Sequence, residues 1–385
     1  MISENILNLI NLFFKKLISV NYFILIIVSV IFCFGVLLLY SAAGGQMDPW
    51  AYKQSIRYIF AIILFIFVSV INIRFWIGSA YYIYFFSLIL IIMVAIFGNV
   101  GMGAQRWLSL GFINLQPSEL MKFSLILVLA RYFHAEKEYT VWGNIKIFLI
   151  PMILIFLPSY LVFLQPDLGS SILLLITSLT VLFIIGLSLW FFVSSAVICS
   201  IAAPFIWMFL LYDYQKNRIL TFLDPYNDPL GSGYHIIQSK IALGSGGLFG
   251  KGFLEGTQSH LNFLPEMQTD FIFTLLAEEF GLIGTFVILS LFIILIFYCL
   301  IIGILSKSRF GCFVAIGVSI NIFYYVFVNT AMVCGLIPVV GVPLPFVSYG
   351  GTSMMSVMFG LGLVSNIYVN RNVKIERFKE GVFGW

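Results

Sequence analysis

The chain is 385 residues long, and 61% of these residues are hydrophobic while only 9% are charged. A soluble domain carries about 25% charged residues, so the composition excludes a water-soluble enzyme, a disordered linker and a nucleic-acid-binding domain as the main class. The net charge of +4 is small, and the five cysteines form no CxxC pair of the kind found in zinc or redox sites. The composition instead predicts a polytopic helical membrane protein.

Ten long apolar segments follow one another along the chain. A helix that crosses a bilayer needs about 20 apolar residues, and the eighth segment is longer than this, so we expect it to tilt or protrude. The segments are Ile18–Ser41, Ile56–Ile71, Ile77–Phe97, Pro117–Phe133, Ile145–Phe163, Ser170–Ile185, Phe191–Leu211, Phe271–Leu305, Phe313–Val333 and Gly351–Val369. The prediction is an all-α, polytopic membrane protein of about ten transmembrane helices, forming one domain over residues 1–385.

Lysine and arginine are distributed unevenly between the two sets of loops. If the N-terminus is inside, the inner segments hold 12 of these residues, whereas the short outer loops hold only Lys53, Arg57 and Arg106. Because positively charged short loops stay in the cytoplasm, we expect both tails, residues 1–17 and 370–385, to be cytoplasmic. The large loop between the seventh and eighth helices, residues 212–269, is then extracytoplasmic.

Acidic residues gather on the side that this orientation places outside. Nine of the sixteen lie on or near it: Asp48, Glu119, Asp167, Asp213, Asp224, Asp228, Glu255, Glu266 and Asp270. Ionised groups at the membrane boundary are costly unless they are paired or hydrated. A chain with so few charges that collects them on one face is predicted to have an outward-facing site near the lipid headgroups.

The first polar cluster precedes the fourth segment and continues into its first turns. Pro117 marks a helix start, and Glu119 lies in the positively polarised first turn. Glu119 and Lys122 share one helix face. One interpretation is an anion-binding pocket of Arg106 and Lys122, with Trp107 as a stacking platform. The other is an arginine–tryptophan anchor at the membrane interface beside a structural Glu119–Lys122 pair.

Two further turns point to the same face. Asp167, in Gln165-Pro-Asp-Leu-Gly169, is either the N-cap of the next helix or a residue that binds a ligand or a metal. The stretch Gly335–Thr352 is rich in proline and glycine at membrane depth, where irregular backbone is tolerated only against protein or water. We expect it to line the outward cavity or to form a stiff re-entrant turn.

Asp270 stands where the large loop enters the eighth span. A carboxylate there is either a helix cap or a general base, because partial desolvation raises its pKa toward the working pH. Glu278 and Glu279 lie about 12 Å deeper, a depth that favours structural pairing or proton handling. Within the loop, Tyr234–Leu243 is predicted to form a short amphipathic helix, and Gly244–Gly252 is predicted to form turns.

Several motifs in this order resemble one family. They are Gln105-Arg-Trp107, Gln116-Pro-Ser-Glu-Leu-Met-Lys122, Gln165-Pro-Asp-Leu-Gly169, Leu264-Pro-Glu with Thr269-Asp-Phe-Ile-Phe273, Ala277-Glu-Glu279 and Pro345-Phe-Val-Ser-Tyr-Gly-Gly-Thr-Ser353. Together they resemble the SEDS proteins (shape, elongation, division and sporulation), and the RodA branch more than the FtsW branch. Met267-Gln268 departs from the Arg-His that is more usual in the RodA branch. This departure concerns the choice between an elongation and a division role, and not the family itself.

The resemblance implies a peptidoglycan glycosyltransferase that polymerises lipid II on the outer face of the bacterial inner membrane. The essential aspartate of the family matches Asp270, and its tryptophan matches Trp107. Arg106, Trp107, Glu119, Lys122, Gln268 and Ser348 are the predicted substrate-binding residues. Arg106 and Lys122, with a divalent cation (Mg or Mn) as the one candidate cofactor, are expected to neutralise charge on the leaving pyrophosphate.

The implied partners are lipid II, the nascent glycan strand, membrane lipids, a class B penicillin-binding protein and the elongation proteins MreB, MreC, MreD and RodZ, without nucleic acid. Two other functions stay open on the sequence. A flippase for lipid-linked precursors would suit intramembrane Lys122, Glu278 and Glu279, although it should place polar groups through the midplane and on both faces. A scaffold without catalysis would gain nothing from buried charge.

Overall fold

The structure is a computed structural model, and it describes residues 15–101, 104–109, 114–135, 145–210, 213–227, 232–257 and 267–375. Ten of its helices correspond to the ten predicted spans. They are α2 (Tyr22–Ala42), α3 (Ala51–Val70), α4 (Ile73–Phe97), α5 (Pro117–Ala135), α6 (Ile145–Leu164), α7 (Leu168–Ile185), α8 (Leu189–Phe205), α12 (Ile272–Leu305), α13 (Arg309–Val333) and α14 (Gly351–Val369). The predicted all-α polytopic fold is confirmed.

Eight of these helices are long and apolar enough to cross a membrane. Helix α5 differs from them because it carries Glu119, Lys122 and Arg131. Its central residues, Met121–Ala130, are nevertheless all buried, since α5 is surrounded by other helices. A charged helix is therefore accommodated by protein contacts rather than by lipid.

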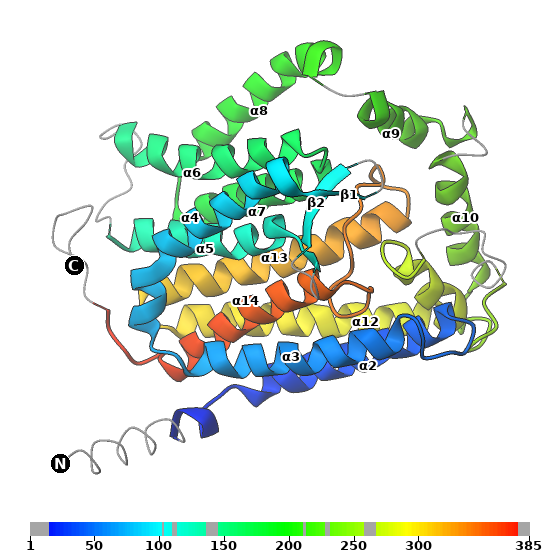
Figure 1. The fold of residues 1–385 in the computed structure, drawn as a ribbon, viewed down its shortest axis with the longest axis horizontal. Helices are drawn as coiled ribbons and strands as arrows, with labels where there is room; N and C mark the ends of the chain where they lie inside the picture. Colours follow the sequence, from blue (N-terminus) through cyan, green and yellow to red (C-terminus); the bar gives the residue numbers. More distant parts are fainter. Residues whose placement is uncertain are drawn as a thin grey trace.

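The helices form one bundle in which α2, α12, α13 and α14 lie side by side (Figure 1). Helix α2 begins and α14 ends at the left of this view. The right-hand end carries α9 (Asp213–Leu223) and α10 (Ser232–Ser245), and α10 runs across the ends of the spanning helices. Helix α10 confirms the short helix predicted within the large loop, whereas α9 was not predicted.

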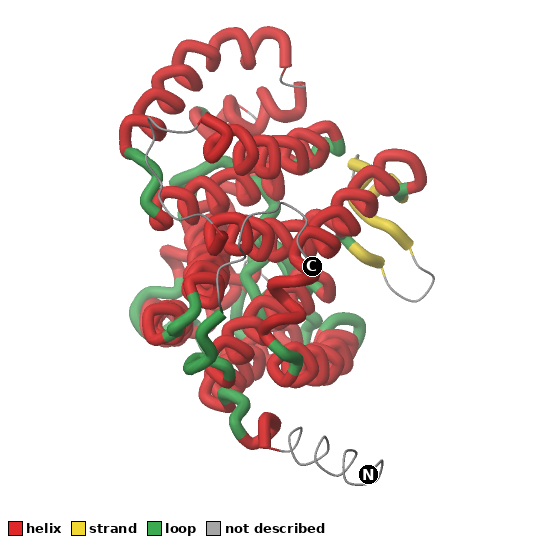
Figure 2. The backbone as a smooth tube through the Cα atoms, turned by 90° about the vertical axis from the view of Figure 1, so that its left-hand side faces the viewer, coloured by secondary structure: helices red, strands yellow, loops and turns green. Residues whose placement is uncertain are grey.

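The loop before α5 contains a small antiparallel sheet that was also not predicted. It consists of β1 (Asn99–Gly101), β2 (Ala104–Ser109) and β3 (Asn114–Leu115), in the order β1-β2-β3. Trp107 pairs with Asn99 across the first two strands. The sheet lies at one side of the helical bundle (Figure 2), and it fixes Arg106 and Trp107 on a strand rather than on a free loop.

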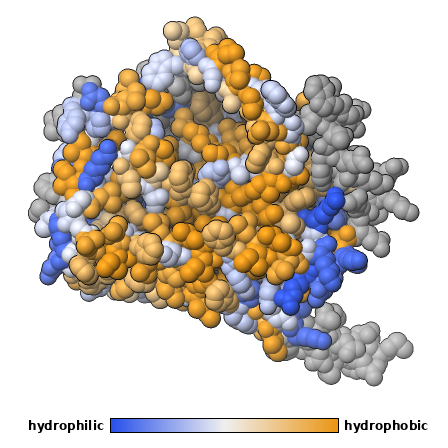
Figure 3. All heavy atoms as spheres, turned by 180° about the vertical axis from the view of Figure 1, so that it is seen from behind, coloured by the Kyte–Doolittle hydropathy of each residue, from blue (hydrophilic) through white to orange (hydrophobic). Residues whose placement is uncertain are grey.

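The surface is apolar over the middle of the molecule, and hydrophilic residues gather toward its two ends (Figure 3). The ends of the bundle also differ in composition. Lys16 donates to the Val70 carbonyl at 3.2 Å, and the Lys307 amide donates to the Arg371 carbonyl at 3.0 Å. These predicted cytoplasmic residues thus lie close together at the end where α2 begins and α14 ends.

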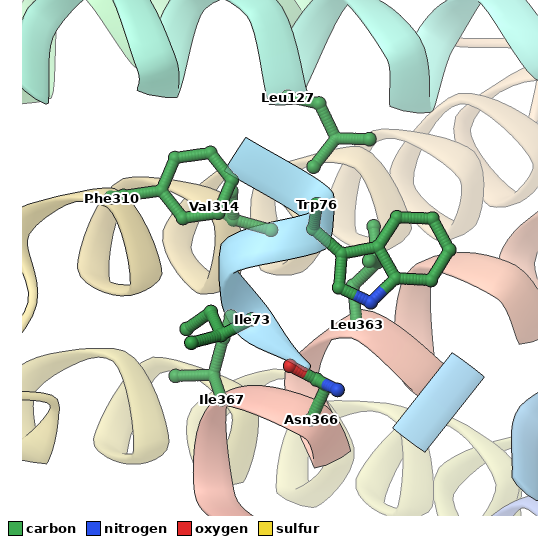
Figure 4. A pocket seen from close by; sticks show the side chains of 8 residues that line it. All are labelled: Ile73, Trp76, Leu127, Phe310, Val314, Leu363, Asn366 and Ile367. Carbon is green, nitrogen blue, oxygen red and sulfur yellow. The ribbon is translucent and has the colours of Figure 1, made fainter. Parts of the chain in front are cut away.

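At that same end, the side chain of Asn366 in α14 caps the C-terminus of α3. Its amide donates to the carbonyls of Val68 and Ser69, both at 3.0 Å, and to that of Ile71. A small cavity beside it is lined by Ile73, Trp76, Leu127, Phe310, Val314, Leu363, Asn366 and Ile367 (Figure 4). The cavity lies at the starts of α4 and α13, far along these helices from the predicted site, and we assign it no function.

Helix α8 stands apart from the bundle along most of its length. Phe192, near its start, contacts Phe183 of α7 with 5.3 Å between the ring centres. Farther along, large apolar side chains are exposed, among them Val193, Val197, Ile198, Ile201 and Phe205. Most of the helix is therefore placed to face lipid rather than protein.

Candidate active site

Asp270 ends the turn that leads into α12, and its main chain is held by α13. The side-chain amide of Asn329 donates to the Asp270 carbonyl at 2.9 Å and to the Val342 carbonyl at 2.8 Å. The side chain of Asp270 is half-buried, and its Oδ2 would lie 3.4 Å from a Cβ atom at Gly341. The carboxylate therefore faces the Pro- and Gly-rich loop that precedes α14.

That loop holds the two residues before Asp270 as well. The Ser348 hydroxyl donates to the Thr269 carbonyl at 2.6 Å and accepts from the Leu344 amide at 2.8 Å. The Tyr349 amide donates to the Gln268 carbonyl at 2.8 Å. Ser348 is buried, so it acts on the backbone beside Asp270, and the turn is fixed by main-chain bonds rather than by packing alone.

Helix α3 supports the same loop from behind. Gln54 is fully buried, donates to the Ser348 carbonyl at 3.1 Å and accepts from the Gly350 amide at 3.4 Å. The Arg57 guanidinium lies 4.8 Å from the centre of the Tyr349 ring, a cation–π distance. The loop is thus ordered by side chains that reach it from α3, α13 and its own turn.

Arg106 of β2 reaches the turn between α6 and α7. Its Nη2 donates to the Pro166 carbonyl at 2.5 Å, and its Nε lies 3.9 Å from Asp167 Oδ1. Asp167 caps α7 by accepting from the Ser170 amide at 3.3 Å, and its other oxygen accepts from Gln116 at 3.1 Å. The capping interpretation of Asp167 is therefore confirmed, and a ligand or metal role for this carboxylate stays a prediction.

A close backbone approach joins this turn to the loop beside Asp270. A Cβ atom at Gly169 would overlap the Val340 carbonyl oxygen, so only glycine allows the approach. Val340 precedes Gly341, the residue that faces Asp270. The turn that carries Asp167 and the Asp270 carboxylate thus both lie against the short backbone segment Val340–Gly341.

Glu119 and Lys122 form a buried network between α5, α13 and α14. Lys122 donates to Glu119 at 2.7 Å and to the Tyr325 hydroxyl at 2.6 Å. Tyr325 also donates to Glu119, and Ser356 donates to the same carboxylate at 3.2 Å. The side chain of Lys122 is 1% exposed. This geometry matches the structural alternative for the pair, and a direct contact of either residue with substrate stays a prediction.

The large loop adds two cations to this end of the molecule. Arg218 of α9 donates to the Val339 carbonyl at 3.2 Å. The side chain of Lys240, from α10, packs against Gly335. Both residues border the loop that carries Gly341, so the positive charge along this loop is not limited to the residues named from the sequence.

The structure brings Arg106, Asp167, Asp270, Gln268 and Ser348 together through a few successive contacts. Trp107, half-buried, is placed beside Arg106 by β2. The Leu264–Glu266 part of the sequence motif lies outside the described residues. A cavity shared by these groups stays a prediction, as does the role of each residue toward substrate.

Sequence reasoning did not single out Tyr325 and Asn329. Both are polar residues inside a largely apolar helix, four residues apart and hence on one face. An intramembrane asparagine is itself a signal of a polar partner, and this signal would have identified Asn329. Among the described residues, no group of three or more His, Cys, Asp or Glu side chains could hold a metal ion.

Comparison with known proteins places this fold. Residues 17–373 match the FtsW/RodA/SpoVE family of cell cycle proteins. The chain is 45% identical over 350 residues to the peptidoglycan glycosyltransferase MrdB of Escherichia coli K12, an alignment that covers 91% of this chain and 93% of MrdB.

Two solved structures agree with the assignment. A chain of a peptidoglycan synthase complex that coordinates polymerization and crosslinking superposes with a TM-score of 0.78 at 29% identity, over 91% of this chain and 98% of that chain. The rod shape determining protein RodA of Thermus thermophilus superposes with a TM-score of 0.69 at 26% identity, over 91% and 97% of the two chains. The chain therefore belongs to the FtsW/RodA/SpoVE family, which is the SEDS family that its motifs resemble.

Proposed function

We propose that this multi-pass membrane protein is a peptidoglycan glycosyltransferase that polymerises lipid II during cell-wall elongation. The activity agrees with the name of MrdB, the 45% identical relative. The elongation role is supported by the likeness to the rod shape determining protein of T. thermophilus. The observation that carries the site is the placement of Asp270 beside Gly341, next to Val340, which the turn after Asp167 contacts at Gly169.

The glycosyl transfer needs one general base and groups that stabilise the leaving pyrophosphate. Asp270 takes the proton from the acceptor sugar hydroxyl as that oxygen attacks the anomeric carbon of the donor. The lipid pyrophosphate leaves with the bonding electron pair, so its growing negative charge needs nearby cations or donors. A second carboxylic acid, of the kind used in glycoside hydrolysis, is not needed for so good a leaving group.

Arg106 is the cation that we assign to the pyrophosphate, with Trp107 placed beside it to stack on a sugar. Its Nε atom is buried 3.9 Å from Asp167 Oδ1, so the Asp167 carboxylate orients the guanidinium. Gln268 and Ser348 hold the turn that carries Asp270. Glu119 and Lys122 hold Tyr325, which lies on α13 one turn before Asn329. A divalent cation would arrive with the pyrophosphate, because magnesium is commonly held by one or two carboxylates and substrate phosphates.

The partner assignment follows the structural neighbour, which belongs to a peptidoglycan synthase complex. We propose that this chain works with a class B penicillin-binding protein and with the MreB, MreC, MreD and RodZ elongation proteins. The proposed location is the bacterial inner membrane, with both termini in the cytoplasm and Asp270 facing the periplasm. The close approach of Lys16 to Val70 and of Lys307 to Arg371, at the end of the bundle away from Asp270, supports this orientation.

The test is polymerisation of labelled lipid II by the purified chain with its transpeptidase. We expect Asp270→Asn and Asp270→Ala to fold and to lose activity by at least about 100-fold, the lower end of the contribution of a general base. The matched control is Asp224→Asn, which removes an exposed carboxylate from the large loop. Near-normal polymer from a folded Asp270→Asn protein would exclude the base role, and lipid movement without polymer would favour the flippase.

A further inference from the structure

Helix α12 is broken eleven residues after Asp270. Gly281 has φ 63° and ψ −160°, which is not helical, so Ile272–Phe280 and the stretch from Leu282 onward are two helices joined at a kink. A break in an apolar layer frees backbone groups that water does not reach, and each of them needs a protein partner. The sequence predicted only an overlong span that tilts or protrudes.

The partners come from the large outer loop. Its segment Gly246–Gly252, here called the docking segment, lies against the break. The amides of Leu282 and Ile283 donate to the carbonyls of Gly247 and Leu248 at 3.0 and 3.2 Å. In return, the docking segment donates its own amides to α12.

These return bonds run from Lys251 to the Glu278 carbonyl, at 2.9 Å, and from Gly252 to the Glu279 carbonyl, at 3.1 Å. Four main-chain bonds therefore replace part of the helical ladder. The docking segment thus contacts the break through its main chain.

Glycine is required on both sides of this contact. A Cβ atom at Gly246 would overlap the Ala277 carbonyl oxygen, and one at Gly250 would overlap that of Glu279. A Cβ atom at Gly281 would overlap the Gly250 amide nitrogen, and Gly250 and Gly281 both have positive φ. The backbones are thus as close as packing permits.

A buried ion pair closes the contact. Lys251 Nζ lies 2.7 Å from Glu278 Oε1, and the Thr257 hydroxyl donates to the same oxygen at 3.2 Å. The side chain of Glu278 is 0% exposed, whereas that of Lys251 is 26% exposed. The carboxylate needs this cation, because a buried charge without a partner is strongly unfavourable.

The short helix Ile272–Phe280 is therefore held at both ends. At its start, Asn329 and Ser348 fix the main chain of Asp270 and Thr269. Two turns farther on, Lys251 and the docking segment fix Glu278. A small shift at Glu278 would be passed to Asp270, since the nine residues Ile272–Phe280 form one rigid helical unit.

We propose that Lys251 and Glu278 are positioning residues, which set the Asp270 carboxylate by clamping the first part of α12 to the outer loop. This inference rests on the proposed function, in which Asp270 is the base. Catalytic groups need their geometry fixed to within about 0.5 Å. A misplacement of about 1 Å that originates far from the reacting atoms costs about 100-fold in rate.

The experiment measures lipid II polymerisation by the full chain, purified with its transpeptidase, for Glu278→Gln and Lys251→Met. Rates are divided by the amount of folded protein. We expect kcat to fall by about tenfold or more with KM within about twofold, because positioning acts on the transition state. The charge-reversed pair Lys251→Glu with Glu278→Lys should restore most of kcat. Glu255→Gln, an exposed acid close to the docking segment that forms no ion pair among the described residues, should change neither constant.

Amide hydrogen exchange over residues 246–252 and 278–285 provides a readout that does not depend on catalysis. Exchange there should rise in the single variants and return in the charge-reversed pair. A normal kcat per folded enzyme in either single variant overturns the inference, whether or not exchange rises. If the single variants do not fold, the double variant Lys251→Met with Glu278→Gln, which removes both charges of the pair, takes their place, and a normal kcat overturns the inference in the same way.

Asp270→Asn is measured in the same assay. If Asp270→Asn is inactive while Glu278→Gln is normal, only the positioning inference fails. If Asp270→Asn is itself active, the proposed base fails first.

Discussion

At the residue scale, the buried cation Lys122 shows how this chain keeps a charge inside an apolar bundle. Its ammonium group contacts Glu119 and the Tyr325 hydroxyl, and it also lies 4.4 Å from the centre of the Tyr325 ring. Every polar atom of the network has a partner on another helix or one turn away. The arrangement connects α5 to α13 and α14, so its first consequence is for stability.

We expect Lys122→Met to destabilise the protein by about 3–5 kcal/mol, because it leaves the Glu119 carboxylate buried without its cation. The double variant Glu119→Gln with Lys122→Met should be more stable than Lys122→Met alone, since it leaves no buried charge. Thermal unfolding in detergent compares the two. Equal stabilities would contradict the buried pair as the source of the effect.

Asp167 offers a second test at the same scale, because it has two separable tasks. Asp167→Asn keeps a good N-cap for α7 but removes the charge that faces Arg106. We expect a change in unfolding free energy of less than about 1 kcal/mol and a fall in polymerisation of about tenfold, which is about 1.4 kcal/mol in transition-state energy. Unchanged activity would mean that Arg106 needs no orienting charge.

At the scale of elements, the site depends on close backbone contacts as well as on side-chain hydrogen bonds. The start of α7 meets the loop before α14 at Gly169, and the docking segment meets α12 at Gly250 and Gly281. When one backbone of such a contact moves, the other must move with it, because no side chain lies between them that could change rotamer. Such contacts also explain why a glycine-rich loop can be an ordered part of a membrane protein.

Gly169→Ala tests this directly. In a helix, alanine is favoured over glycine by about 1 kcal/mol, yet the new methyl group would displace Val340 and the loop that faces Asp270. We expect a net loss of stability of about 1–3 kcal/mol and reduced polymerisation. Gly244→Ala in α10 is the matched control, because nothing lies within 4 Å of its Cβ position, and it should be neutral or stabilising in the same melting and activity assays.

At the scale of the whole molecule, the two ends of the bundle have different chemistry. The end with Lys16, Lys307 and Arg371 matches the lysine- and arginine-rich set of loops. The other end carries α9, α10, the small sheet and Asp270. This polarity is what the positive-inside rule uses to orient a membrane protein.

The orientation is testable with single cysteines in a cysteine-free chain. Tyr226→Cys, in the large loop, replaces a residue that is 78% exposed, and Asn372→Cys replaces an exposed residue after α14. A thiol reagent that does not cross membranes should label the first in intact spheroplasts and the second only after permeabilisation. The reverse pattern would place Asp270 in the cytoplasm and rule out the proposed reaction.

The sequence was sufficient for the ten spans, because long apolar runs are strong signals in a membrane protein. Its motifs also named Gln268 and Ser348, which the structure places beside Asp270, but they did not name Asn329, which holds the Asp270 main chain. The sequence could not predict the sheet that carries Arg106, since its strands are short and interrupted by glycine. It also could not predict the break at Gly281, because a lone glycine is common in spanning helices. The partner of Glu278 was hidden for a related reason: Lys251 lies 27 residues earlier, and no local pattern joins them.

Helix α8 has a consequence for how this protein tolerates mutation. Apart from Phe191 and Phe192 at its start, most of its large apolar side chains are exposed. Selection on most of α8 should therefore act on side-chain hydrophobicity rather than on side-chain size and shape. A saturation library should accept leucine, isoleucine, valine and phenylalanine interchangeably along Val193–Phe205 and reject charges, whereas α5 should reject most exchanges of size.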